Sequence, residues 1–152
     1  MALYLVQHGK SLPKEEDSQQ GLSQQGRNDT RRVGEVAAGY GVHVAAIWHS
    51  TKARARQTAQ ILADCLHPEQ GVHEIQGLKP LDDVAAFAAR LSGTDDIMLV
   101  GHLPFMSRLA SHLVIGKQQP IFKFQNSGIV CLRQETEDHS WIIAWTLMAH
   151  IR

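Results

Sequence analysis

The chain has 152 residues and no net charge, because fifteen Lys and Arg balance fifteen Asp and Glu. A chain of this length is typical of one domain with one core, and we expect a single domain over residues 1–152. The charge balance argues against a general affinity for nucleic acid or an anionic membrane. With 43% hydrophobic and 20% charged residues, the composition excludes a disordered chain.

Strand-like residues begin at once, in place of the basic segment and apolar run of a signal peptide. We find no apolar stretch long enough to span a membrane, so we expect a cytoplasmic protein with no membrane partner. The two cysteines, Cys65 and Cys131, form no Cys-x-x-Cys pair, which disfavours a zinc knuckle or a thioredoxin-type site. We expect Cys65 on a helix and Cys131 in a strand, both reduced and buried.

Apolar strands alternate with helical patterns through residue 116. The expected elements of this part are a strand over 2–7, a helix from the N-cap Ser23 to Gly39 or Gly41, a strand over 44–48, a helix over 52–66 capped by Ser50 or Thr51, a strand over 72–75, a helix opened by Asp82 or Asp83 and ended by Gly93, a strand over 97–100, and a helix from Pro104 to Gly116. Val36 and Tyr40 are expected on the inner face of the first helix. Two further strands, 127–132 and 141–147, are expected to pair at an antiparallel edge.

This alternation predicts a three-layer α/β/α fold with a mostly parallel central sheet and helices on both faces. Right-handed crossovers bring the C-terminal ends of the parallel strands to one rim, where open α/β sheets bind ligands. His8, His49 and His102 each follow one of these strands. We therefore expect the three histidines on that rim.

Three cations, Lys52, Arg54 and Arg56, fall in the first turns of the second helix. The helix macrodipole disfavours positive charge there, and a bound anion would relieve the conflict. Helix N-terminal amides and the arginine fork both bind phosphate. We expect Arg54 to bind an anion, and Lys52 and Arg56 to be solvated surface cations.

His8 and His102 could each be a buried histidine with a structural hydrogen bond, or they could form one site with Arg54. The chain has no His-Glu-x-x-His spacing, and two histidines without a nearby carboxylate are a poor metal set, so we expect no metal. Two imidazoles and a guanidinium suit a phosphoryl group, which a neutral imidazole can attack. Gly9 would let the backbone approach that anion closely.

Three motifs occur in a fixed order: the Gln7-His8-Gly9 turn, the segment Arg54-Ala55-Arg56-Gln57-Thr58, and Gly101-His102. Together they resemble the histidine phosphatase superfamily, and the short length is similar to its small branch, the SixA-type phosphohistidine phosphatases. The resemblance implies a phosphoglycerate-mutase-like fold and catalysis through a phosphohistidine on His8. Arg54 and His102 would hold the phosphoryl oxygens. No metal or organic cofactor is implied.

The family signature has an arginine where this chain has Gln7. A neutral amide would replace a charge-assisted contact that is roughly twice as strong. The loss could cost several kcal/mol, by analogy with about 2.7–4 kcal/mol for an oxyanion-hole donor. Lys10 could supply the missing charge or be an ordinary exposed lysine. Gln7, Gly9, Lys10 and Ser50 are the candidate substrate-binding residues.

Asp82 and Asp83 follow the third strand, where larger members of the family place an acidic residue. Each could be a general acid or a helix N-cap. A weak acid site would matter little for phosphohistidine, because imidazole titrates near neutrality and leaves already protonated, whereas an alkoxide needs a proton donor.

The resulting hypothesis is a monomeric phosphatase acting on a phosphoprotein, such as a histidine-containing phosphotransfer domain. The same site could take a small phosphorylated metabolite. A third possibility is a phosphate-binding regulatory module, in which Gln7 has abolished turnover.

Overall fold

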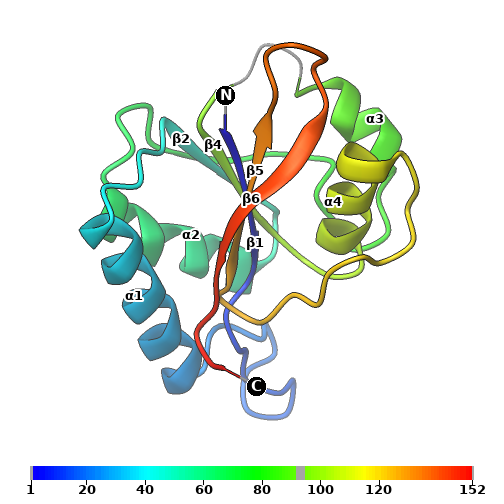
Figure 1. Cartoon of the computed structure of the whole chain (residues 1–152). Coiled ribbons are helices and arrows are strands. Elements are labelled where there is room, and N and C mark those ends of the chain that lie inside the picture. Colours follow the sequence, from blue (N-terminus) through cyan, green and yellow to red (C-terminus); the bar gives the residue numbers. More distant parts are fainter. Residues whose placement is uncertain (1, 92–94, 152) are drawn as a thin grey trace.

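The structure, a computed structural model, describes residues 2–91 and 95–151 (Figure 1). Its elements are β1 (Ala2–Gln7), α1 (Gln24–Gly39), β2 (Ala46–His49), α2 (Ala53–Leu66), β3 (Val72–Glu74), α3 (Val84–Ala89), β4 (Ile97–Gly101), α4 (Phe105–Ile115), β5 (Ile129–Gln134) and β6 (Trp141–Leu147). Each element expected from the sequence is present. The third helix ends earlier than expected, at Ala89, and its expected stop, Gly93, lies outside the described residues.

The strands form one six-stranded sheet in the order β3-β2-β4-β1-β5-β6. The pairs β3–β2, β2–β4 and β4–β1 are parallel, whereas β5 pairs antiparallel with both β1 and β6. α1 and α2 cover one face of the sheet, and α3 and α4 cover the other (Figure 1). The expected three-layer fold with a mostly parallel sheet and an antiparallel C-terminal edge is therefore confirmed.

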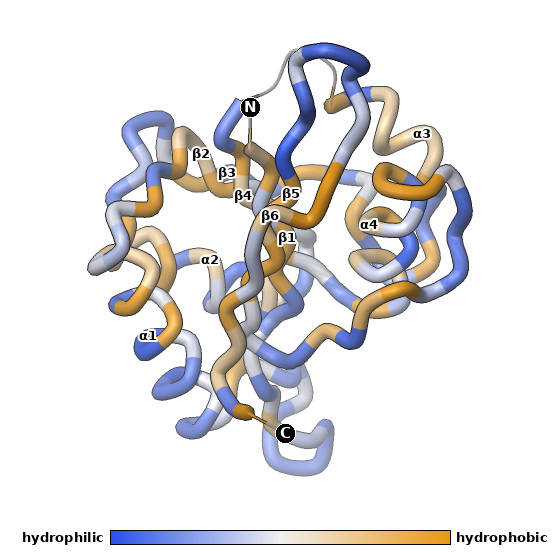
Figure 2. Tube along the Cα trace, viewed as in Figure 1, coloured by the Kyte–Doolittle hydropathy of each residue, from blue (hydrophilic) through white to orange (hydrophobic). Residues whose placement is uncertain are grey.

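β1 lies inside the sheet and is covered on both faces, which explains its uninterrupted apolar sequence. Leu3 and Leu5 pack in the cluster under α3 and α4, and Tyr4 and Val6 pack in the cluster under α1 and α2. Figure 2 shows that the central strands are hydrophobic and the outer loops hydrophilic. None of the helices in residues 2–91 and 95–151 is long and apolar enough to cross a membrane.

The expected inner face of α1 was partly wrong. Val36 and Tyr40 are 40% and 83% exposed, because α1 turns a different set of residues to the core. That buried stripe consists of Gly26, Thr30, Val33, Gly34 and Ala37.

The expected cap of α2 and the expected burial of one cysteine were also wrong. The N-cap is Lys52 rather than Ser50 or Thr51, and its side chain makes no capping hydrogen bond. Cys65 is only half-buried, although Cys131 is buried as expected, and both thiols are free.

The loop after β1 packs closely against the start of α1. Ser23 donates both its backbone N–H and its hydroxyl to the carbonyl oxygen of Lys10, each at 2.9 Å. A Cβ added at Gly26 would lie 2.1 Å from that same oxygen, and one at Gly9 would lie 2.9 Å from Thr30 Oγ1. This packing against α1 is a sufficient reason for glycine at both positions.

We expect Gly26→Ala to lower the free energy of unfolding by about 1–3 kcal/mol, because the added methyl group would collide with rigid backbone. Gly39→Ala is the matched control, since nothing lies within 4 Å of its added Cβ. In a helix, that change should stabilise the protein by up to about 1 kcal/mol. Urea unfolding of both variants measures the difference, and equal stabilities would contradict the packing argument.

Candidate active site

The site begins where two parallel neighbours, β1 and β4, end side by side. Gln7 is in register with Gly101, and the backbone N–H of His8 donates to the carbonyl of Gly101 at 3.0 Å. The next residues, His8 and His102, consequently face each other, with ring centroids 5.1 Å apart and ring planes at 55°. The expectation that these two histidines meet at the rim is confirmed.

The half-buried ring of His8 is held in one tautomer. Its Nδ1 lies 2.7 Å from the carbonyl oxygen of Gly9. Because a carbonyl only accepts, Nδ1 carries the hydrogen and Nε2 keeps its lone pair. Burial lowers the pKa of His8, and the charge of Arg54 acts in the same direction against the opposing effect of the Gly9 hydrogen bond. At neutral pH, His8 is therefore an uncharged base with a free Nε2.

His102 is 1% exposed, and its Nε2 lies 2.6 Å from the hydroxyl oxygen of Ser50. Burial is the main cause that lowers the pKa of His102 to about 3, and the charges of His8, Arg54 and Lys52 add to the effect. Its buried Nδ1 has no hydrogen-bond partner in the described part of the chain. Nδ1 is therefore the ring nitrogen of His102 that the described residues leave unpaired.

Thr58 joins the His8 loop to the first turns of α2. Its hydroxyl accepts a hydrogen bond from the backbone N–H of Gly9 at 2.9 Å and donates one to the carbonyl of Arg54 at 2.8 Å. The side chain is fully buried, so both bonds are shielded from water. Thr58 thereby sets the position of the His8 loop relative to Arg54. Its place one turn after Arg54 on the same helix was the available sequence signal, but it did not reveal this role.

Asn126 supports the same loop from the opposite end of the chain. Its side-chain amide donates to the carbonyl of His8 at 2.9 Å, and the N–H of Ser127 donates to the carbonyl of Gln7 at 2.9 Å. Sequence reasoning missed Asn126, and no local pattern marks it. Only the return of the chain into β5, beside β1, brings it to the site.

Two of the candidate substrate-binding residues, Gln7 and Lys10, lie in different surroundings. Gln7 buries its amide oxygen with no hydrogen-bond partner among the described residues. Lys10 is exposed, and its Nζ lies 3.4 Å from the side-chain oxygen of Gln25. Lys10 is not among the charges that lower the pKa of His8 and His102, and its part in phosphate binding stays a prediction.

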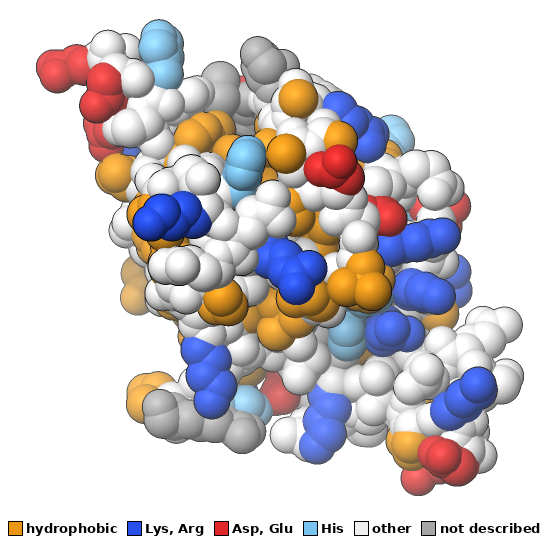
Figure 3. Space-filling model, turned by 90° about the vertical axis from the view of Figure 1, so that its right-hand side faces the viewer, with side chains coloured by type: hydrophobic (Ala, Val, Ile, Leu, Met, Phe, Trp, Pro, Cys, Tyr) orange, Lys and Arg blue, Asp and Glu red, His pale blue; other side chains and the backbone are white. Residues whose placement is uncertain are grey.

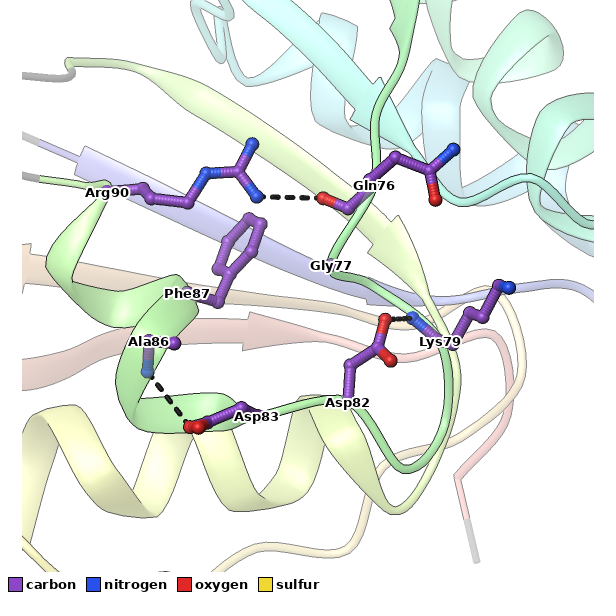
Figure 4. A pocket seen from close by; sticks show the side chains of 8 residues that line it. All are labelled: Gln76, Gly77, Lys79, Asp82, Asp83, Ala86, Phe87 and Arg90. Atoms are coloured by element: carbon purple, nitrogen blue, oxygen red, sulfur yellow. Dashed lines mark hydrogen bonds between the residues drawn. The ribbon is translucent and has the colours of Figure 1, made fainter.

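Asp82 and Asp83 each accept a hydrogen bond from a nearby backbone amide (Figure 4). Asp82 accepts from the N–H of Lys79 at 2.9 Å, and Asp83 caps α3 by accepting from the N–H of Ala86 at 3.0 Å. They line a cavity with Phe87 and Arg90 rather than with the histidines. Neither carboxylate contributes to the shifted pKa of His8 or His102. The N-cap alternative therefore holds for Asp83.

The site is positively charged even though the whole chain is neutral. The cations whose charges lower the pKa of His102 are Arg54 and Lys52, both at the start of α2. Lys and Arg side chains also gather on the lower and right-hand parts of the face in Figure 3. Within residues 2–91 and 95–151 there is no cluster of three or more His, Cys, Asp or Glu side chains able to hold a metal ion. The arrangement suits an oxyanion.

Comparison with known proteins identifies the family of the chain. Residues 3–86 match the family model of the histidine phosphatase superfamily (branch 1). The chain is 32% identical over 143 residues to an uncharacterized protein of Picosynechococcus sp., covering 88% of this chain and 85% of that protein. It is 27% identical over 128 residues to the phosphohistidine phosphatase SixA of Escherichia coli, covering 80% of each.

Among solved structures, the protein histidine phosphatase SixA complexed with tungstate superposes with a TM-score of 0.85 at 24% identity, over 98% of this chain and 97% of that one. The family model and the fold together place the chain among phosphatases with a phosphoglycerate-mutase-like fold. The chain belongs to the histidine phosphatase superfamily (branch 1), and it is similar to SixA-type members of that family.

The two environments of His102 and His43 predict opposite titrations. Burial lowers the pKa of His102 to about 3, whereas hydrogen bonds to Asp96 and Glu69 raise the pKa of the exposed His43. As the pH falls from 8 to 5, we expect the ring signals of His43 to shift early and those of His102 to stay at their neutral positions. NMR titration of the ring protons measures both, and protonation of His102 near pH 6.5 would contradict its burial.

We expect Thr58→Val to lower kcat by roughly tenfold or more, because it frees the His8 loop from the helix that carries Arg54. The lost hydroxyl also leaves the N–H of Gly9 unpaired, which should cost about 1–3 kcal/mol of stability. Thr58→Ser keeps the hydroxyl and is the matched control. Kinetics at a temperature where both variants are fully folded separate the two effects, and an unchanged kcat in Thr58→Val would show that the bond does not position His8.

Proposed function

We propose that this chain is a phosphohistidine phosphatase that acts on phosphoproteins and carries the phosphoryl group on His8. The observation that carries the proposal is the free Nε2 of His8, fixed by the 2.7 Å bond from Nδ1 to the Gly9 carbonyl beside a neutral His102. The similarity to the phosphohistidine phosphatase SixA of Escherichia coli supports the same substrate class.

In the proposed reaction, His8 Nε2 attacks phosphorus in line with the leaving group. A new P–N bond forms on His8 while the P–N bond of the substrate breaks, and its electron pair returns to the leaving imidazole. Arg54 and the Nδ1 of His102 bind the phosphoryl oxygens as charge shifts onto them. Water then attacks the phosphohistidine, giving inorganic phosphate and restoring the free Nε2 of His8.

The choice of leaving group rests on the placement of acidic residues. Asp82 and Asp83 each accept a hydrogen bond from a backbone amide, and the cavity that they line does not include His8 or His102. An alkoxide leaving group needs a positioned proton donor, whereas imidazole accepts its proton near neutral pH without one. The site therefore favours a P–N bond over a phosphate ester. A histidine-containing phosphotransfer domain in the cytoplasm is the kind of protein substrate that this chemistry fits.

The test compares phosphate release from a phosphohistidine peptide, a phosphoserine peptide and small phosphate esters. We expect the phosphohistidine peptide to be hydrolysed with the highest kcat/KM, and we expect His8→Ala to abolish its turnover. A transient phosphoryl adduct on wild-type His8, trapped by rapid quenching without acid and detected by mass spectrometry, would identify the intermediate.

Two outcomes would overturn the proposal in different ways. Release no faster than in His8→Ala, together with retained phosphate binding, would indicate a regulatory phosphate-binding module. Preference for a small ester would indicate a metabolite phosphatase with the same nucleophile.

A further inference from the structure

Helix α2 begins with a residue that its local structure does not explain. Its N-cap is Lys52, whereas Ser, Thr, Asp and Asn are preferred there, and the Lys52 side chain makes no capping bond. The first turn has no acidic residue to balance the cations. Local rules broken without compensation are characteristic of functional sites, and Lys52 is exposed and thus free to meet a ligand.

The backbone of Lys52 lies beside Ser50, the residue that contacts His102 at the catalytic rim. Its backbone N–H lies 3.4 Å from Ser50 Oγ, which in turn lies 2.6 Å from Nε2 of His102. Lys52 is therefore two hydrogen-bond links from the buried His102 ring and two residues from Arg54. The positive charge of Lys52 lowers the pKa of His102, as does that of Arg54. Lys10, the other lysine near the histidines in sequence, lies instead beside Gln25.

The charge of the ligand calls for more than Arg54 alone. A phosphoryl group carries a charge of about −1.5 to −2 near neutral pH. His8 and His102 are neutral, and Gln7 contributes no charge, so Arg54 would balance only part of the anion. Lys52 has a flexible four-carbon stem and a compact ammonium group, which suits a point contact with a phosphoryl oxygen.

We propose that the Lys52 ammonium is the second cation of the phosphoryl-binding site, and that it supplies the charge which Gln7 does not. The inference rests on the proposed function only in placing the phosphoryl group between His8, His102 and Arg54. It concerns anion binding, which can be measured without turnover. Lys52 thereby becomes a substrate-binding residue rather than a solvated surface cation.

The first test measures inorganic phosphate and orthovanadate binding to Lys52→Met, Lys52→Arg and Lys14→Met. We expect Lys52→Met to weaken binding of both anions about tenfold and to make the affinity less sensitive to salt. Lys52→Arg keeps the charge and should stay within about threefold of wild type. Lys14 is an exposed lysine of the preceding loop, and Lys14→Met should have no effect. Equal losses in Lys52→Met and Lys52→Arg, or no loss in Lys52→Met, would overturn the inference.

The second test adds a positive charge at position 7 to the variant that lacks the Lys52 ammonium. We expect Gln7→Arg to restore most of the anion affinity that Lys52→Met loses, because both cations would serve the same phosphoryl group. If Gln7→Arg restores nothing, the two positions do not share one role and the inference fails.

These experiments also distinguish this inference from the proposed function. If Lys52→Met weakens phosphate binding while wild-type protein releases no phosphate from phosphohistidine, the proposed function fails and the inference stands. If phosphohistidine is hydrolysed and Lys52→Met binds phosphate normally, the reverse holds.

Discussion

The pairing of β1 with β4 is the constraint on which the rest of the site depends. It holds Gln7 in register with Gly101 and ends on the hydrogen bond from the His8 N–H to the Gly101 carbonyl. Because both strands lie inside the sheet, with α1 and α2 on one face and α3 and α4 on the other, neither can shift without disturbing the core. Parallel pairing in this register brings together His8 and His102, which are 94 positions apart in the sequence, so that their rings face each other.

Within this frame, burial and charge give the histidines and the cations of the site different roles. The buried positions hold imidazoles, which can lose their charge, and burial keeps both of them neutral at physiological pH. The permanent charges lie at the start of α2, where Lys52 is exposed and Arg54 half-buried, so that their charged groups pay a smaller desolvation penalty. A neutral nucleophile beside fixed cations suits attack on an anionic phosphoryl group, because the nucleophile stays unprotonated while the cations attract the substrate. Thr58 couples the two parts through one buried hydroxyl.

Much of this could be predicted from the sequence. The apolar runs ending in His8 and His102, and the alternation of strand and helix, were enough to predict the fold and the meeting of the two histidines at one rim. Predictions that depend on how a helix is turned toward the core were partly wrong. Val36 and Tyr40 follow helical spacing but lie outside the buried stripe of α1. The role of Lys10 stays a prediction, although its Nζ lies 3.4 Å from the side-chain oxygen of Gln25.

The sequence by itself determined the order of the elements, the residues delivered at the strand ends and the absence of an arginine before His8. These are local properties, set by hydrophobic periodicity and by the fixed geometry of parallel sheets. Only the tertiary structure decided that Asp83 serves as a helix cap, that Asn126 and Thr58 hold the His8 loop, and that Gly9 is required by the closeness of α1. Such contacts join residues far apart in the chain, and their distances depend on how loops and helices pack, which no periodicity along one segment encodes.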